Sequence, residues 1–325
     1  MADDKGKAED DETPAEYRMR NPPIAAEGPV VNSAADTSSA IATICGPIDE
    51  FQATEENIPR HPAILAAGKR RTGKSTSLDN LMEKTMQHIP FGMVMTETSY
   101  NGFWQKRVPP RLVFQGWRED ILLSLIERQK RMIAKHGKKD PRTFAFIILD
   151  DVIADQRAIR WSKNINSFFV EGRHINITVL ITTQNMKGIG PMIRGNMDIV
   201  FIQPIYNLNE RDVLHELFGG FLPKKIFHGL MDEIVQVIEL PGNTASDPKL
   251  KMRIMVVQDW RQTRDCNLKF KWWEPVHSDE LPPYKLCHPA YWKERPEDIA
   301  KTQGVKHYKA LADTIEEVSS LFREK

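Results

Sequence analysis

The most informative part of the sequence reads Gly68-Lys69-Arg70-Arg71-Thr72-Gly73-Lys74-Ser75, and Thr76 follows it. It fits G-x-x-x-x-G-K-[ST], the pattern of a loop whose backbone N–H groups surround a polyphosphate. Glycine at 68 and 73 permits the close approach of backbone to phosphate. Lys74 is predicted to reach the β- and γ-phosphates, and Ser75 to hold Mg²⁺. The sequence therefore predicts that residues 68–76 bind ATP together with Mg²⁺.

The flanking residues support this loop. Residues 63–67 form a short apolar run, as a buried parallel strand would. Residues 75–88 carry apolar side chains at the three- and four-residue spacing of an amphipathic helix. A phosphate site needs this order, because the loop must end at the positive end of a helix dipole. A chance Gly- and Lys-rich surface turn would need neither element.

Composition limits the class of protein. The 325 residues are 41% hydrophobic, which is enough for a sizeable core. The net charge of +1 is uneven, since the first 16 residues carry −5 and the remainder +6, a mild basic excess that permits a nucleic-acid partner. Cys45, Cys266 and Cys287 are too few and too widely spaced for a disulfide framework, which favours an intracellular compartment. No apolar run approaches the roughly 20 residues that span a bilayer, so no membrane span is predicted.

Strands and helices are predicted to alternate beyond the loop. The predicted strands are 91–96, 112–114, 144–149, 175–182 and 198–202, with a hairpin of 233–240 and 251–259. The predicted helices are 118–136, 156–172, 209–219 and 223–231. Such alternation is typical of an α/β fold with a mostly parallel central sheet and helices on both faces.

Three regions are expected along the chain. Residues 1–40 are acidic and poor in large apolar groups, so a disordered tail is predicted. Residues 41–260 hold the loop and the alternating elements. Residues 261–325 form an extension rich in Pro and aromatic residues, with a terminal helix over 309–325 that packs on its own domain or on another subunit.

Two carboxylates follow the apolar strand 144–149 directly. Asp150 is predicted to share Mg²⁺ with Ser75, because α/β sheets bind ligands at the carboxyl ends of their strands. Asp151 is predicted to act as the general base that polarises the attacking water. Most hydrolytic ATPases of this kind use the longer Glu at that position. The alternative is that the pair caps the next segment.

Gln184 ends the following strand. It is predicted to hydrogen-bond the γ-phosphate or the attacking water, although a plain strand-ending amide is the alternative. Thr182 and Thr183 are expected to be structural. Because the site has no obvious arginine of its own, an arginine from a neighbouring subunit is expected. Arg173 is the preferred candidate, Arg194 is the other, and either alone could be an ordinary surface residue.

The segment 106–139 is strongly basic, with ten Lys or Arg residues against three acids. Together with Phe103 and Trp104 it is a candidate for contact with a phosphate backbone. A solvated helix face explains the same charges.

Taken together, these motifs resemble the genome-packaging ATPases of large double-stranded DNA viruses, the poxvirus-type branch of the FtsK/HerA superfamily. The resemblance covers about residues 60–240. The motifs that carry it are GKRRTGKS (68–75), FIILDD (146–151), VLITTQ (179–184) and IGPMIRGNMDIVFIQ (189–203).

The resemblance implies a RecA-like P-loop NTPase that hydrolyses ATP and works as a homo-oligomeric ring. Its partners would be double-stranded DNA and a capsid or portal-like vertex component. It would act inside the infected host, in a cytoplasmic virus factory, and could stay associated with the virion. The resemblance also supports Gln184 as the γ-phosphate sensor and an arginine finger acting in trans.

Other classes share the loop. A small-molecule kinase would want an acceptor pocket and an Arg-rich lid, and a guanine-specific switch protein would want Asn-Lys-x-Asp, which the segment 184–188 does not provide. A P-loop ATPase or kinase-like nucleotide-binding protein that does not translocate DNA stays open as the alternative, as does a non-catalytic subunit that retains the loop.

Overall fold

The computed structural model describes residues 34–152, 163–242, 244 and 250–293. A sheet in the order β3-β2-β4-β5-β1-β6-β8-β7 forms its centre, and β9 pairs with β8. The strands are β1 (Ala63–Ala67), β2 (Phe91–Thr96), β3 (Val113–Gln115), β4 (Ala145–Asp150), β5 (Ile177–Thr183), β6 (Ile199–Ile202), β7 (Gln236–Glu239), β8 (Leu250–Gln258) and β9 (Phe270–Trp273). The α-helices are α2 (Ala34–Cys45), α3 (Lys74–Thr85), α4 (Glu119–His136), α6 (Lys163–Glu171), α7 (Pro191–Arg194), α8 (Leu208–Leu214), α9 (Lys224–Ile234) and α10 (Cys266–Lys269).

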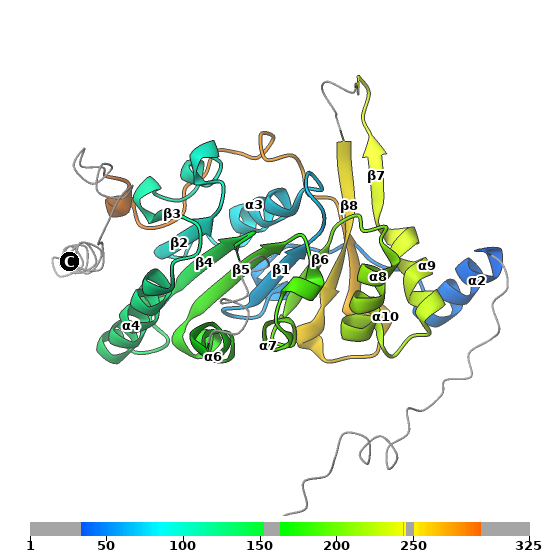
Figure 1. Cartoon of the computed structure of the whole chain (residues 1–325), viewed down its shortest axis with the longest axis horizontal. Coiled ribbons are helices and arrows are strands. Elements are labelled where there is room, and N and C mark those ends of the chain that lie inside the picture. Colours follow the sequence, from blue (N-terminus) through cyan, green and yellow to red (C-terminus); the bar gives the residue numbers. More distant parts are fainter. Residues whose placement is uncertain (1–33, 153–162, 243, 245–249, 294–325) are drawn as a thin grey trace, which may run out of the picture.

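The first six strands in this sheet order, which are β3, β2, β4, β5, β1 and β6, all run parallel. Figure 1 shows α3 on one face of this sheet and α4, α6 and α7 on the other. Every residue of β1, β2, β4 and β5 is buried, as expected for strands covered on both faces. The predicted α/β fold with a mostly parallel sheet is confirmed.

Close packing between β2 and β4 explains why residue 92 is glycine. Gly92 on β2 lies beside Phe146 on β4, and a Cβ atom at position 92 would come within 2.1 Å of the Phe146 ring. Phe146 is itself fully buried, so its ring cannot move out into solvent. Glycine at 92 therefore makes room for the aromatic core between the two strands.

Helix α4 begins and ends where local charge favours it. Glu119 and Asp120 occupy its first turn, and Lys135 and His136 its last, which complements the helix dipole at both ends. Gly137 follows with a φ of 86°, a conformation that few other residues adopt readily. The helix thus matches the predicted range to within one residue.

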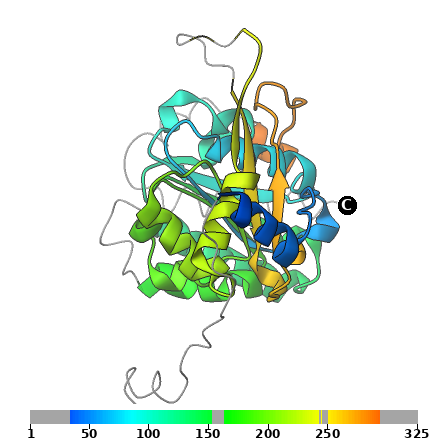
Figure 2. The same cartoon turned by 90° about the vertical axis from the view of Figure 1, so that its right-hand side faces the viewer.

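The second half of the sheet is antiparallel. β8 pairs with β6 through Met255 to Gln258, and its earlier residues pair with β7. Both views show this hairpin projecting beyond the body of the molecule (Figures 1 and 2). Because β8 runs against β6, the projecting residues leave the sheet at the carboxyl edge of the parallel strands, where the phosphate loop also lies.

Two predicted boundaries need correction. Residues 34–40 belong to α2, so the predicted tail of residues 1–40 ends too late; Ile41 on this helix is buried and would lie 2.9 Å from a Cβ atom at Gly229 of α9. The predicted extension 261–325 begins inside the sheet, because β9 pairs with β8. Residues 1–33 and the predicted terminal helix over 309–325 lie outside the described residues.

The Pro-rich segment after β9 packs along α3. The Asn80 side chain on α3 donates to the carbonyl of Val276 at 2.8 Å and accepts from its N–H at 2.9 Å. The hydroxyl of Tyr284 donates to the carboxylate of Asp79, which is fully buried and also binds the Arg107 guanidinium at 2.9 Å. We call residues 276–292 the strap, since they fasten the helix that follows the phosphate loop.

Candidate phosphate and metal site

The loop between β1 and α3 is shaped by close backbone packing. A Cβ atom at Gly68 would lie 2.4 Å from Cβ of Gln203, the residue that follows β6, and 2.7 Å from Oγ1 of Thr72. Gly73 has a φ of 85° and Arg71 a φ of 62°, both in the left-handed region. Such turns bend the backbone into the concave shape that binds anions. The loop ends directly at Lys74, the first residue of α3.

Lys74 lies under this loop with 7% of its surface exposed. Its Nζ donates to the carbonyl of Lys69 at 3.0 Å and lies 3.9 Å from Oδ2 of Asp151. Burial lowers the pKa of Lys74, while the nearby Asp151 and Asp150 carboxylates raise it. The ammonium group therefore stands in a partly dry site beside the loop, where a phosphate would be a better partner than a carbonyl.

Strand register brings Asp150 to the centre of the site. Thr96 on β2 and Thr182 on β5 are its direct neighbours across the sheet. Oδ1 of Asp150 accepts from Thr182 Oγ1 at 2.7 Å and from Ser75 Oγ at 3.3 Å. Oδ2 accepts from Thr96 Oγ1 at 3.1 Å and from the indole Nε1 of Trp104 at 2.9 Å. Four donors from four segments thus hold one carboxylate.

The residues fit Mg²⁺. Two oxygen ligands in neighbouring positions of an octahedral magnesium site stand roughly 3 Å apart, given metal–oxygen distances of about 2.1 Å. Ser75 Oγ and Asp150 Oδ1 are 3.3 Å apart. A hydroxyl and a carboxylate are also the donors that this ion takes from proteins, with water and phosphate oxygens completing its shell.

Asp151 directly follows β4 and has a left-handed φ of 57°. Its N–H donates to Thr182 Oγ1 at 2.9 Å, and its Oδ2 accepts from Nε2 of Gln184 at 2.8 Å. About a third of the Asp151 side chain is exposed. The turn therefore aims this carboxylate toward Gln184 and Lys74, while Asp150 points to Ser75 and Trp104.

Sheet order explains why these groups meet. β5 lies between β1 and β4, so Gln184 at its end stands between the phosphate loop and the two aspartates. The sequence predicted Lys74, Ser75, Asp150, Asp151 and Gln184 for one site, and the structure brings all five together. Their roles in catalysis stay a proposal.

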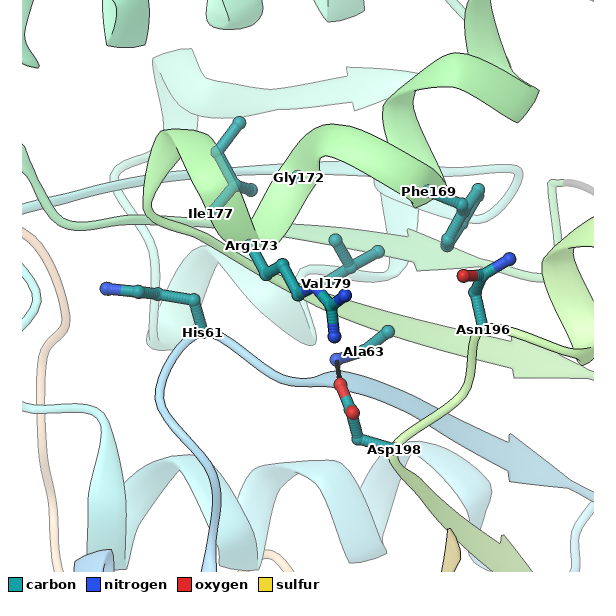
Figure 3. Close-up of a pocket in the computed structure, with 9 residues that line it drawn as sticks. All are labelled: His61, Ala63, Phe169, Gly172, Arg173, Ile177, Val179, Asn196 and Asp198. Carbon is teal, nitrogen blue, oxygen red and sulfur yellow. Dashed lines mark hydrogen bonds between the residues drawn. The ribbon is translucent and has the colours of Figure 1, made fainter. Parts of the chain in front are cut away.

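The two candidate arginines lie in different parts of the sheet's surroundings. Arg173 belongs to the 3₁₀ turn Gly172–Ile175 that precedes β5, at the amino edge of the sheet. Figure 3 shows its side chain pointing toward Ala63 and Asp198. Burial raises the pKa of Asp198, while the Ala63 N–H and the Arg173 guanidinium lower it. Arg194, at the end of α7, donates to the Met186 carbonyl at 3.3 Å.

Sequence reasoning missed three residues of the site. Thr182, expected to be structural, donates to Asp150 and accepts from the N–H of Asp151. Thr96 is the last residue of β2, and Thr182 is the last but one of β5. A polar residue at the carboxyl end of an apolar strand could therefore have pointed to both residues in the sequence. Trp104 had no such signal, because it lies in an irregular connection, in the turn Trp104–Lys106.

The basic segment 106–139 is used partly inside the molecule. Arg107 binds the buried Asp79, and the buried Arg128 lies over the ring of Phe91 at 4.0 Å, whereas Arg118 pairs with Asp120 at 2.6 Å at the surface. Arg107 and Arg128 therefore point into the protein, and contact of the segment with a phosphate backbone stays a prediction. In the part of the chain that the structure describes, no helix has the length and apolar character needed to cross a bilayer.

Comparison with known proteins gives one family and several viral relatives. Two curated relatives are uncharacterized protein 015R of Frog virus 3 (isolate Goorha), 24% identical over 232 residues, and uncharacterized protein 075L of Invertebrate iridescent virus 6, 33% identical over 173 residues. The matches cover 71% and 53% of this chain, and each spans 66% of the relative.

One similar solved structure is the genome packaging NTPase B204 of Sulfolobus turreted icosahedral virus 2, in complex with AMPPCP. It is 14% identical to this chain, and the alignment covers 66% of this chain and 98% of B204 with a TM-score of 0.44. The family model described as Poxvirus A32 protein matches residues 52–214. That range is half of the chain and contains the loop, both aspartates and Gln184, and the chain therefore belongs to the Poxvirus A32 protein family.

Proposed function

We propose that this chain is an ATP-hydrolysing motor that translocates double-stranded DNA during the packaging of a viral genome. The observation that carries the proposal is the meeting of Lys74 and Ser75 with Asp150, Asp151 and Gln184 at one edge of the sheet. Membership of the Poxvirus A32 protein family supports the proposal, and the resemblance of the motifs to genome-packaging ATPases suggests ATP as the substrate and double-stranded DNA as the polymer that is moved.

ATP binding would exchange the partners of Lys74. The loop N–H groups and the dipole of α3 favour a polyphosphate in front of the loop. Lys74 would then leave the Lys69 carbonyl and bind the β- and γ-phosphates, since an ammonium binds an anion more strongly than a neutral oxygen. Ser75 and Asp150 would hold Mg²⁺, which supplies charge stabilisation on the phosphate oxygens.

Hydrolysis would then follow from the second carboxylate. Asp151 takes a proton from the attacking water, the water oxygen bonds to the γ-phosphorus, and the bond from that phosphorus to the β–γ bridging oxygen breaks to leave ADP. Gln184 now donates to Asp151, and would turn its amide to the water or the γ-phosphate when nucleotide arrives. The hydrogen bond between the two side chains keeps both near the same point in space.

A ring of identical subunits would complete the site. Arg173 is exposed and lies at the edge of the sheet opposite its own loop, so it could serve only the nucleotide of a neighbour. Charge at the transition state is what such a finger stabilises. The ring would act on DNA at a capsid or portal-like vertex, inside a cytoplasmic virus factory of the infected host.

The test is phosphate release from ATP by the full chain, with and without duplex DNA. Turnover should need Mg²⁺, rise with duplex DNA and disappear in Lys74→Ala and Asp150→Ala. Lys84→Ala is a matched control, because it removes an exposed lysine from the same helix. An ATP turnover that does not change with duplex DNA would favour an ATPase or kinase-like protein without translocation. Full turnover in Asp150→Ala would refute the proposed phosphate and metal site.

A further inference from the structure

Trp104 makes a contact that the proposed chemistry does not yet use. It is 1% exposed, and its indole N–H donates to Oδ2 of Asp150 at 2.9 Å. The residue lies between β2 and β3, far in sequence from both the loop and the aspartates. An indole N–H can only donate, so this contact commits Asp150 to act as the acceptor.

The donors on Asp150 divide between its two oxygens. Oδ1 faces Ser75, the other predicted ligand of Mg²⁺. Oδ2 faces away and is taken by Trp104 and Thr96. Rotation of the Asp150 carboxylate about its Cβ–Cγ bond would break the hydrogen bonds that Trp104 and Thr96 donate to Oδ2. Oδ1 is therefore the atom presented to the metal position.

Trp104 is itself fixed from several sides. Phe103 packs against it edge to face, with ring centroids 4.8 Å apart. The Trp104 carbonyl accepts from the N–H groups of Arg107 at 2.9 Å and Val108 at 2.8 Å. Arg107 in turn binds Asp79 on α3, and its carbonyl accepts from Leu286 of the strap. The indole thus stands on a frame that includes the helix following the phosphate loop.

We propose that Trp104 is a positioning residue that orients the Asp150 carboxylate so that Oδ1 faces Mg²⁺ beside Ser75. The inference rests on the proposed function, since it concerns the metal of the ATP site. Groups that orient a metal ligand through its other atoms typically contribute about 10- to 100-fold to metal affinity. Packing alone would not require the indole nitrogen, because a phenyl ring fills most of the same volume.

The test compares the full chain with Trp104→Phe, which keeps an aromatic ring and removes the N–H. Binding of a fluorescent ATP analogue is titrated with Mg²⁺ and repeated in EDTA. Trp104→Phe should need about 10- to 100-fold more Mg²⁺ for half-maximal tight binding and should bind the analogue normally in EDTA. Trp260→Phe is the matched control, because its indole nitrogen is buried without a hydrogen-bond partner in the described residues.

A second replacement guards against loss of the fold. Benzothienylalanine at position 104 keeps the two-ring shape and puts sulfur where the N–H stood, so it should shift the Mg²⁺ requirement in the same direction with an unchanged melting temperature. An unchanged Mg²⁺ requirement in this folded variant would overturn the inference. Failure of the unaltered chain to bind the analogue at all would instead refute the proposed ATP site.

Discussion

The amide of Gln184 donates to Oδ2 of Asp151 at 2.8 Å, so the proposed sensor and the proposed base are hydrogen-bonded to each other. Lys74 stands 3.9 Å from the same oxygen. An entering γ-phosphate offers new partners to both Gln184 and Lys74. The carboxylate would then face a water molecule with fewer competing donors, which suits a base that must accept a proton.

Replacing Asp151 by Asn should separate binding from hydrolysis. The amide keeps the size of the side chain but cannot take a proton from water, so turnover should fall by about 10²- to 10⁴-fold while ATP binding stays within a few-fold of normal. Phosphate release and analogue binding measure the two effects. Asp279→Asn, an exposed position in the strap, serves as control. Equal loss of binding and turnover would contradict the assignment of Asp151 as base.

Thr182→Val should damage both the fold and the site. The variant keeps the shape of this fully buried residue but leaves Asp150 Oδ1 and the Asp151 N–H without their hydroxyl partner. We expect a loss of about 1–3 kcal/mol in unfolding free energy and a higher Mg²⁺ requirement. Denaturant melts and Mg²⁺ titrations test this, with Thr183→Val as the neighbouring control. Normal Mg²⁺ dependence in Thr182→Val would mean that the residue is only structural.

Much of this site could be predicted from contiguous sequence. The loop is a short pattern, and the apolar runs before Asp150 and Gln184 mark where strands end. What could not be predicted depends on which strands become neighbours. The row of Thr96, Asp150 and Thr182 exists only because β2, β4 and β5 pair in that order and register.

Contacts between segments far apart in the sequence could not be predicted either. The burial of Asp79 with Arg107 and Tyr284 joins a helix, a connection and the strap, which no periodicity could reveal. For the same reason the basic residues looked like one surface in sequence, although Arg107 and Arg128 turn inward. Nothing in the Pro- and aromatic-rich composition of the C-terminal segment predicted that the strap packs on α3.

Mixing experiments should test the proposal that an arginine acts in trans and should identify that arginine. Arg173→Ala alone should bind ATP but hydrolyse it poorly, as should Asp151→Asn alone. Rings assembled from both variants contain interfaces with an intact base from one subunit and an intact Arg173 from the next, so phosphate release should partly return. The same mixture made with Arg194→Ala is the comparison. Recovery with Arg194→Ala and none with Arg173→Ala would reassign the finger.

Acid stability should depend on His61. Burial, helped by Arg60 and Lys138, lowers the pKa of His61 from 6.5 to about 4. The unfolded chain therefore binds a proton at this residue below about pH 6.5 that the folded chain does not bind until about pH 4, and stability should fall as pH falls through that window.

His61→Gln should flatten the dependence of unfolding free energy on pH between about 6.5 and 4, by at most about 1 kcal/mol per pH unit. Urea melts at a series of pH values measure this slope. The exposed His277, replaced by Gln, gives the control. An unchanged slope in His61→Gln would show that other groups set the acid sensitivity.

Displacement of a third strand from a DNA triplex reports whether this chain moves along DNA, because a protein that translocates on the duplex strips that strand as it hydrolyses ATP. We expect the unaltered chain to displace it in the presence of ATP and Mg²⁺, and Asp151→Asn to bind the same DNA without displacing it. Continued ATP hydrolysis on the triplex substrate with the third strand left in place would contradict a translocating motor.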